Sequence, residues 1–196
     1  MIKTKDDLKY YLQCDKVALG INKKHPSFLH DAIWKFEILY RKTEYHFNNR
    51  DSIFHRLAYM IYYFRFRRQC IKRCSEFPLN VFEEGLVIWH GYNIIINGNA
   101  RVGRNFSISA NCCIGQAHNE YPTIGNNVEM SLGSIIIGGI KVADDVTIGA
   151  GAVVTKSIDE SFTTWGGVPA KLISRKQNNY VTEKKKRLAT TIKQMK

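Results

Sequence analysis

Two different spacings of apolar residues divide the chain. Up to about residue 75, apolar positions recur at intervals of three and four, which predicts helices. The first two predicted helices lie before and after a break at 25–27, and Pro78 ends the helical region. A third helix is predicted from about Ser52, with a row of apolar residues along one side: Phe54, Leu57, Ala58, Ile61 and Phe64.

From about residue 86 the spacing changes to six. Two uninterrupted series of aliphatic residues at every sixth position begin at Ile96 and at Ile124. Glycine or another small or polar residue follows most of these positions, and the fifth place of most hexads is small or apolar. The first places of the hexads are Ile96, Val102, Ile108, Ile114, Ile124, Met130, Ile136, Val142, Ile148 and Val154.

A period of six is the hexapeptide repeat, and it predicts a mainly β fold, the left-handed parallel β-helix. A short strand and a tight turn form one flat side, and three sides close a coil of about 18 residues whose aliphatic first places stack about 4.8 Å apart. Each coil buries its face only against its neighbours, so several coils are needed. The hexads are enough for about four.

The repeat also locates an insertion and the limits of three segments. Ile124 follows Ile114 at a longer interval than six, which predicts an extruded loop near 117–123. We therefore expect an α-helical N-terminal region over 1–80, the β-helix over 81–173, and a basic C-terminal tail over 174–196.

Charge separates the same three segments. The formal net charge is +12, with sixteen basic and ten acidic residues in 1–85, four and six in 86–170, and nine and one in 171–196. Such a balance is compatible with the phosphates of a nucleotide cofactor, with an anionic lipid or polysaccharide, or with nucleic acid. No helix-turn-helix, zinc-finger or RNP-type motif accompanies the charge, so no nucleic-acid partner is expected.

The cysteines and the apolar runs bear on the compartment. The five cysteines are an odd number, and the first residues show no apolar signal-peptide core, so we expect reduced thiols in the cytoplasm. Cys70 and Cys74 lie one helical turn apart without a second pair at zinc spacing, so no metal is expected. The longest apolar run, 57–64, is far shorter than the roughly 18 residues of a membrane span.

A series of short motifs resembles one known family. Trp89-His90-Gly91, the Val102-Gly and Ile114-Gly pairs, Pro122-Thr-Ile-Gly125, and the final Gly167-Val-Pro-Ala-Lys171 follow one another in order. About residues 75–175 are similar to the serine-acetyltransferase-like branch of the hexapeptide acyltransferases, which includes serine O-acetyltransferases and relatives that modify capsular or other surface sugars. The resemblance implies transfer of an acetyl group from acetyl-CoA, without a metal, in a homotrimer whose active sites lie between subunits.

His90 is the expected general base. A histidine suits this role because its unperturbed pKa lies near 6.5, and His90 interrupts the hexad pattern six residues before Ile96. Members of the family orient their histidine with an aspartate, and Ser75 occupies the corresponding position here. Glu76 is the expected substitute, and the alternative is that no carboxylate orients the histidine.

The acceptor pocket departs from the serine-specific pattern. Serine-specific members carry an acid directly before the histidine and an Arg-His pair before the proline, where this chain has Trp89 and Glu120-Tyr121. An indole offers a flat apolar surface for a sugar ring, and His118 and Tyr121 add hydrogen-bonding groups. We therefore expect a saccharide acceptor. The alternatives are that Trp89 packs at the edge of the coil and that His118 is a solvated loop residue.

Acetyl-CoA is expected in a groove between two subunits. By position, Gly115, Leu132 and Ala150 match the residues of the family that contact the pantetheine arm. Pro169, Ala170 and Lys171 match the segment near the adenine, and Lys171 and Arg175 suit its phosphates. Lys171 could instead be a solvated lysine of the tail.

The tail carries a weak helical row of apolar residues and is expected to be solvated. Shielding of CoA, contact with a neighbouring subunit, and contact with an anionic glycan or membrane are alternatives.

The sequence thus predicts an acetyl-CoA-dependent O-acetyltransferase that acts on a saccharide, such as a capsular or other surface polysaccharide. The basic helix over 65–73 is expected to bring it to anionic polymer or to a lipid-linked intermediate at the inner face of the membrane. Serine O-acetylation in cysteine biosynthesis and a non-catalytic repeat scaffold are the alternatives.

Overall fold

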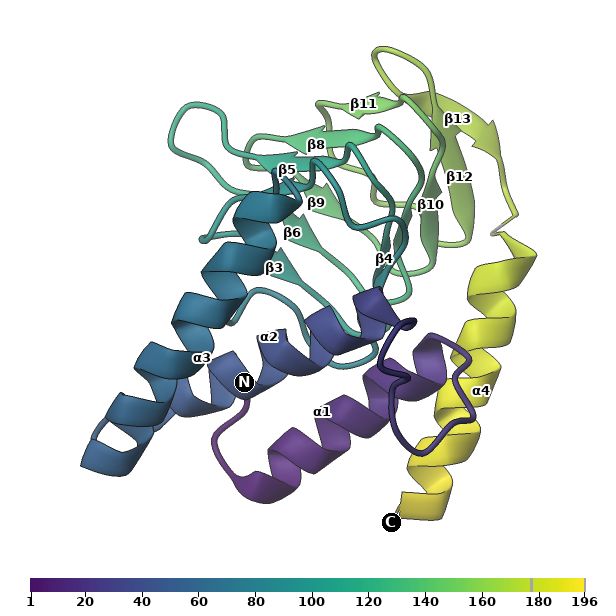
Figure 1. Cartoon of the computed structure of the whole chain (residues 1–196). Helices are drawn as coiled ribbons and strands as arrows, with labels where there is room; N and C mark the ends of the chain where they lie inside the picture. Colours follow the sequence, from purple (N-terminus) through teal and green to yellow (C-terminus); the bar gives the residue numbers. More distant parts are fainter. Residues whose placement is uncertain (177, 196) are drawn as a thin grey trace.

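The computed structural model describes residues 1–176 and 178–195, and within them three N-terminal helices, a β-helix and a C-terminal helix follow in order (Figure 1). The helices are α1 (Lys5–Ala18), α2 (Ala32–Asn48), α3 (Ile53–Lys72) and α4 (Asn179–Met195). The strands are β1 (Val87–Ile88), β2 (Ile95–Ile96), β3 (Arg101–Val102), β4 (Ser107–Ile108), β5 (Cys113–Gly115), β6 (Thr123–Ile124), β7 (Glu129–Met130), β8 (Ile135–Ile137), β9 (Lys141–Val142), β10 (Val146–Ile148), β11 (Val153–Val154), β12 (Thr163–Gly166) and β13 (Lys171–Ser174).

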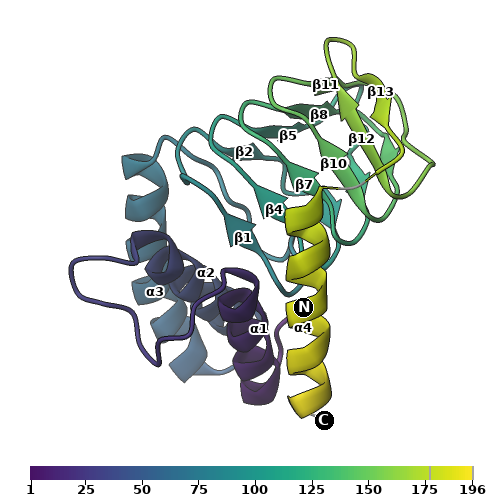
Figure 2. The same cartoon turned by 90° about the vertical axis from the view of Figure 1, so that its right-hand side faces the viewer.

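Three parallel sheets form the three sides of the β-helix, which confirms the predicted fold. Their strand orders are β1-β4-β7-β10-β12-β13, β2-β5-β8-β11 and β3-β6-β9, so each strand pairs with the strand one coil further on. Among the named strands of the described residues, only the final pair, β12 with β13, is antiparallel. Figure 2 shows the coils stacked one above another.

The register of the strand pairs shows which coils contain extra residues. Ile96 pairs with Ile114, 18 positions later, as a regular coil requires. Val102 pairs with Ile124, 22 positions later, which places the predicted four-residue excess between these strands. Ile88 pairs with Ile108, 20 positions later, so the first coil holds two further residues that the hexad pattern did not reveal.

The predicted first-place residues make the core of the β-helix. Every one of the ten is buried, and so are most of the residues two places before them, for example Ala100, Phe106, Val128 and Val146. Stacked aliphatic side chains therefore fill the coil from end to end, which is the source of its stability.

The helices α1 and α2 close the first coil with buried carboxylates. Asp15 accepts hydrogen bonds from the backbone N–H groups of Gly85 and Leu86 at 2.8 and 2.9 Å, and Glu37 accepts one from Ile88 at 2.9 Å. Arg41 joins this layer through Asp15 at 2.7 Å. Because the outermost strand of a sheet presents unpaired backbone groups, these contacts satisfy donors that no further coil can reach.

The expectation of a solvated tail is wrong. Residues 179–195 form α4, which lies beside α1 and below the six-stranded sheet (Figure 2). Val181 and Leu188 are buried, and the Lys184 ammonium donates to the Asn105 carbonyl at 2.7 Å and to the Ser107 hydroxyl. The weak apolar row in the sequence is the face that packs.

The apolar row of α3 does not face the core. Phe66 and Cys70 are the buried residues of this helix, whereas Phe54, Leu57 and Ile61 are exposed. The helix packs on α2 through a different side, because Phe66 stacks on Phe36 with ring centroids 5.6 Å apart. No helix within the described residues combines the length and apolar character needed to cross a membrane.

Candidate functional site

The site is best described by the edges at which the sheets of the β-helix meet. One edge follows the strands of the six-stranded sheet and contains residues 89–93, 109–111, 131–133 and 149–151. Hydrogen bonds of 2.9–3.0 Å connect it from coil to coil, from Asn111 to Tyr92, from Gly133 to Ala110 and from Gly151 to Leu132. We call it the His90 edge.

His90 lies at this edge and not at a hexad first place. Ile88 occupies the first place, pairs with Ile108 and is buried, and the two extra residues of the first coil lie between Ile88 and Asn93. The backbone of His90 has a φ of 50°, in the left-handed region. The insertion therefore carries the imidazole outward, where it is exposed, and corrects the expectation that His90 replaces an aliphatic first-place residue.

The neighbours of His90 hold the corner in shape. The Trp89 N–H donates to the Ile108 carbonyl at 2.8 Å, and the Tyr92 N–H donates to the His90 carbonyl at 2.5 Å. An added Cβ at Gly91 would approach both Ile33 and Ile88 to 3.0 Å, so α2 and the core press on the corner. The backbone on both sides of His90 is thus held in place by hydrogen bonds and packing.

Glu76 and His90 are not brought into contact among the described interactions. Glu76 forms an isolated parallel β-bridge with Ile95. It also lines a cavity of about 560 Å³ together with Tyr63 and Arg67. Ser75 is buried, and its hydroxyl accepts from the Ile94 N–H at 3.1 Å and donates to the Arg73 carbonyl at 2.9 Å. Ser75 thus supports the backbone just before β2. The role of Glu76 as the carboxylate that orients His90 stays a prediction.

Trp89 contacts a residue that sequence reasoning missed. Its ring meets the ring of Tyr180 edge to face, with centroids 5.7 Å apart, so α4 covers part of the indole. The Tyr180 hydroxyl is buried without a hydrogen-bond partner among the described residues. The only sequence signal for this contact was the apolar row of the tail, which indicated a helix but not its place.

The predicted loop lies at a different edge, between the four-stranded and three-stranded sheets. Its tip is a two-residue hairpin, in which Ala117 and Glu120 exchange backbone hydrogen bonds of 3.3 and 2.9 Å. His118 and Asn119 between them both have positive φ, as a type I′ turn requires. His118 is exposed and Tyr121 is half-buried. We call this the loop edge, and Gly115 at the end of β5 belongs to it.

The residues matched to acetyl-CoA are shared between the two edges and the last coil. Leu132 and Ala150 are exposed on the His90 edge, whereas Gly115 is on the loop edge. The turn at Pro169 and Ala170 closes over β11, because the Ala170 N–H donates to the Val153 carbonyl at 2.8 Å. The structure therefore groups Leu132 and Ala150 with His90, and separates Gly115 from them.

The two basic residues matched to the phosphates differ in their contacts. Lys171 begins β13 and is exposed. Arg175 donates to Glu160 at 2.8 Å in an exposed ion pair. Exposed pairs of this kind contribute little to stability, so a phosphate could displace Glu160 at small cost.

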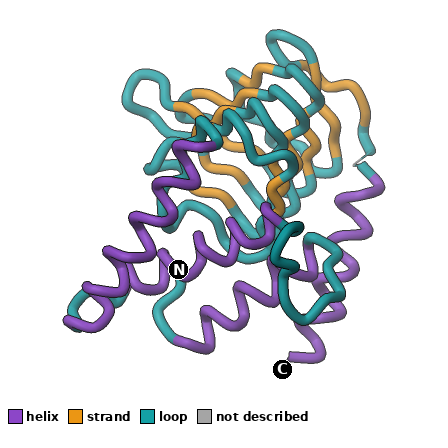
Figure 3. Tube along the Cα trace, in the orientation of Figure 1, coloured by secondary structure: helices purple, strands orange, loops and turns teal. Residues whose placement is uncertain are grey.

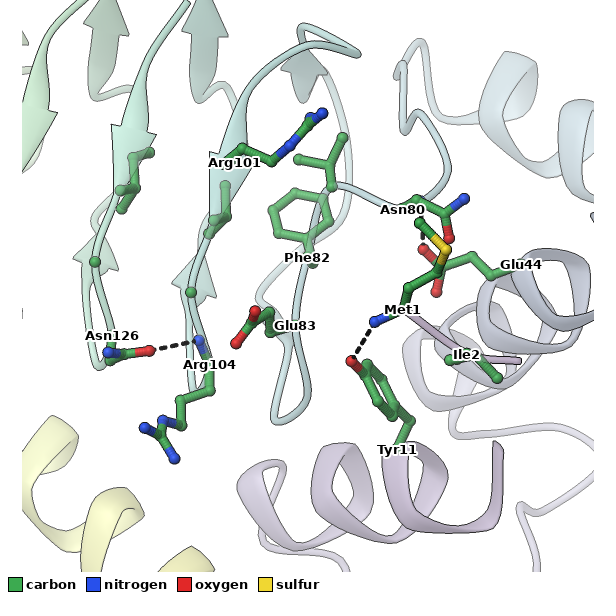
Figure 4. A pocket seen from close by; sticks show the side chains of 15 residues that line it. Met1, Ile2, Tyr11, Glu44, Asn80, Phe82, Glu83, Arg101, Arg104 and Asn126 are labelled. Atoms are coloured by element: carbon green, nitrogen blue, oxygen red, sulfur yellow. Dashed lines mark hydrogen bonds between the residues drawn. The ribbon is translucent and has the colours of Figure 1, made fainter. Parts of the chain in front are cut away.

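The pocket in Figure 4 lies away from all these residues. Its volume is about 440 Å³, and α1, α2, the N-terminus and the three-stranded sheet supply its walls. The N-terminal ammonium donates to the Tyr11 hydroxyl at 3.0 Å, and the lining also includes Arg101, Arg104, Glu83 and Glu44, of which Glu44 pairs with Arg41 at 2.9 Å. It contains none of the predicted site residues. Within the described residues no cluster of three histidine, cysteine or acidic side chains could hold a metal ion.

Comparisons with known proteins agree on one group of relatives. No family model matches the chain. It is 35% identical over 94 residues to a serine acetyltransferase of Staphylococcus epidermidis, covering 46% of this chain and 44% of that protein. It is 37% identical over 98 residues to the mitochondrial serine acetyltransferase 3 of Arabidopsis thaliana, covering 48% and 25%. The chain thus spans less than half the length of these curated relatives.

Solved structures show the same fold. A serine acetyltransferase in complex with cysteine matches with a TM-score of 0.67 at 20% identity, covering 87% of this chain and 71% of that one. A serine acetyltransferase in complex with CoA matches with a TM-score of 0.66 at 18% identity, covering 86% and 71%. The chain is therefore serine-acetyltransferase-like in its repeat sequence and in its fold. The comparisons give no support to the narrower resemblance to capsular polysaccharide O-acetyltransferases.

Proposed function

We propose that the protein transfers an acetyl group from acetyl-CoA to a hydroxyl group, with His90 as general base. The observation that carries this proposal is the outward placement of His90 at an edge whose exposed residues continue through Leu132 and Ala150 to the final turn. The relatives named above are serine acetyltransferases, and one of the similar structures is a complex with CoA. The fold, the sequence similarity and the position of His90 support the same chemistry.

The reaction needs few groups. The imidazole of His90 takes the proton of the acceptor hydroxyl as its oxygen attacks the thioester carbonyl carbon. The C–S bond then breaks, the acetyl group stays on the acceptor oxygen, and the imidazolium returns the proton to the leaving thiolate of CoA. Backbone N–H groups are suitable donors for the developing oxyanion. An exposed imidazole can reach both the acceptor hydroxyl and the leaving thiolate, and histidine is the side chain most often used for such proton transfers.

The separation of the two edges supports an active site between two copies of the chain. His90, Leu132 and Ala150 lie on the His90 edge, whereas Gly115 and His118 lie on the loop edge. One chain cannot place both edges around one ligand, because the four-stranded sheet separates them. In a homotrimer, the His90 edge of one copy faces the loop edge of the next, which completes the site.

The comparisons favour L-serine as the acceptor over a saccharide. All the relatives reported above are serine acetyltransferases, so serine O-acetylation is better supported than the polysaccharide reaction expected from Trp89. Trp89 also packs against Tyr180, which leaves less of its ring for a sugar. A sugar hydroxyl is the second candidate, because the chain has Trp89 and Glu120-Tyr121 where charged groups for an amino acid are expected.

Release of free CoA from acetyl-CoA tests the proposal, with L-serine and surface saccharides as separate acceptors. We expect acceptor-dependent release that falls by about 10²–10⁴-fold in His90→Ala. Release with serine alone identifies the amino acid as acceptor, and release with a saccharide alone identifies the second candidate. Absence of CoA binding by equilibrium titration contradicts the proposal and favours a non-catalytic scaffold.

A further inference from the structure

The outer side of α3 is an apolar strip that is largely exposed, although the His46 ring meets Phe54 edge to face and the Arg68 guanidinium lies over the Phe64 ring. Six large side chains spaced along three turns of the helix are each between 52% and 68% exposed. Large exposed apolar patches on a folded protein mark binding surfaces more often than isolated apolar residues do. The strip consists of Ile53, Phe54, Leu57, Met60, Ile61 and Phe64.

A cationic groove lies between α2 and α3 beside this strip. Its volume is about 570 Å³, and its floor is apolar, with Phe36, Leu39 and Tyr62. Aspartate and glutamate are absent from its lining, and none of its lysines and arginines forms an ion pair with a described residue. These uncompensated cations are Lys35, Lys42, Arg65, Arg68, Lys72 and Arg73.

Arg73 shows that the groove has unused hydrogen-bonding capacity. Its side chain is 8% exposed, its guanidinium lies 4.9 Å from the centre of the Phe36 ring, and its Nη1 donates to the side chain of Gln69 at 2.5 Å. Its Nε is buried without a partner among the described residues. Leaving a charged donor buried and unpaired costs free energy, and a planar guanidinium matches the oxygens of a phosphate.

We propose that the face formed by α2 and α3 binds an anionic phospholipid bilayer, with lipid phosphates in the cationic groove and the apolar strip inserted at the interface. An apolar strip beside a row of cations is the arrangement by which amphipathic helices lie at a membrane surface. The residues of α3 include no acid. This proposal is independent of the acetyl-transfer reaction, because none of its residues lies at either edge assigned to that reaction.

Two other occupants explain only part of this surface. A soluble phosphate compound accounts for the cations of the groove and leaves the apolar strip exposed to water. A second copy of the chain covers the strip, but it brings the same acid-free helix and provides no anion for the groove. An anionic bilayer satisfies both features at once.

Flotation of the full-length protein with lipid vesicles tests the proposal. We expect binding to vesicles of phosphatidylcholine mixed with phosphatidylglycerol, no binding to phosphatidylcholine alone, and weaker binding as salt rises. The double variant Arg65→Gln/Arg68→Gln should bind about 30-fold more weakly, since each basic residue near an anionic surface contributes about 1 kcal/mol. Leu57→Gln/Ile61→Gln should also weaken binding, because it removes the inserted apolar area.

Matched variants on α4 control for net charge. Lys186→Gln/Lys193→Gln removes two exposed charges from another surface and should leave vesicle binding and CoA release unchanged. Failure of the wild type to bind anionic vesicles, or equal binding by the Arg65 and Arg68 variant, overturns the proposal. The proposal is also overturned if inorganic phosphate releases the protein from vesicles and Leu57→Gln/Ile61→Gln leaves vesicle binding unchanged. If the wild type does not bind vesicles and Leu57→Gln/Ile61→Gln forms a smaller oligomer than the wild type, the strip is a contact between copies of the chain.

Discussion

The buried side chain of Lys184 makes the stability of the folded protein depend on pH. Burial lowers the pKa of its ammonium to about 7, while the nearby Glu129 and Glu37 act in the opposite direction. Arg187 on the same helix lowers this pKa further, and Asp15 on α1 raises it. A neutral amine keeps enough hydrogens to donate to both the Asn105 carbonyl and the Ser107 hydroxyl.

The sign of the resulting pH dependence follows from proton counts. In the unfolded chain Lys184 keeps its proton up to a pKa near 10.5, whereas in the folded protein it loses it above about pH 7. Between these values the unfolded state binds more protons, so this group's contribution to stability rises with pH, by at most about 1.4 kcal/mol per pH unit. Below about pH 7 the penalty for burying the charge is fully present.

We expect the free energy of unfolding of the wild type, relative to Lys184→Met, to increase between pH 7 and pH 9. Urea titrations of both proteins at the two pH values measure this difference, and Lys186→Met serves as the exposed control. An equal difference at both pH values contradicts the prediction and shows that Lys184 stays charged in the folded protein.

At the scale of the elements, the corners of the β-helix limit which residues the hexads accept. Gly125 lies where one coil passes close to the next, and an added Cβ would come within 2.3 Å of the Asp144 carboxylate and 2.9 Å of its backbone nitrogen. The same carboxylate accepts from the Asn126 N–H at 2.7 Å. A side chain at Gly125 would therefore displace both a backbone contact and a hydrogen bond between coils.

Gly125→Ala is expected to destabilise the protein by about 1–3 kcal/mol, the usual range for overpacking a well-packed site. Gly98→Ala is the matched control, because its added Cβ would lie 3.5 Å from Pro78 and meet no closer atom. Urea unfolding of both variants measures the difference. Equal stability of the two variants would show that the corner at Gly125 relaxes without loss.

At the scale of the whole molecule, the β-helix separates side chains that the sequence analysis assigned to one site. The four-stranded sheet lies between His90 on one edge and His118 and Tyr121 on the other. Two copies arranged around a closed symmetry axis bring unlike edges into contact. The proposed site is therefore a property of the assembly.

Mixed assemblies of two impaired variants test this arrangement. Chains with His90→Ala are unfolded and refolded together with chains carrying His118→Ala/Tyr121→Ala. If each site combines the His90 edge of one copy with the loop edge of the next, random trimers restore roughly a quarter of the sites. CoA release should rise well above that of either variant alone. Release equal to the average of the separately refolded variants would instead place each site within one chain.

The hexad pattern alone determined the β-helix, the core and the position of the loop. Ile96, Ile124 and their successors repeat at a fixed spacing because each must reach the same interior line, so local sequence carries the information. The interval between Ile114 and Ile124 located the loop for the same reason. The break in the pattern singled out His90 but placed it at an interior first place, whereas a two-residue insertion after Ile88 puts it outside.

Only the tertiary structure decided which surfaces are covered. An apolar row predicts a packed helix face, yet the row of α3 is exposed, and the weaker row of α4 packs against the β-helix over Lys184. Periodicity indicates that a helix has an apolar side. Which segment packs on that side depends on how the rest of the chain folds. The contact of Trp89 with Tyr180 joins the first coil to the C-terminal helix, which are far apart in the sequence, so no local spacing could indicate it.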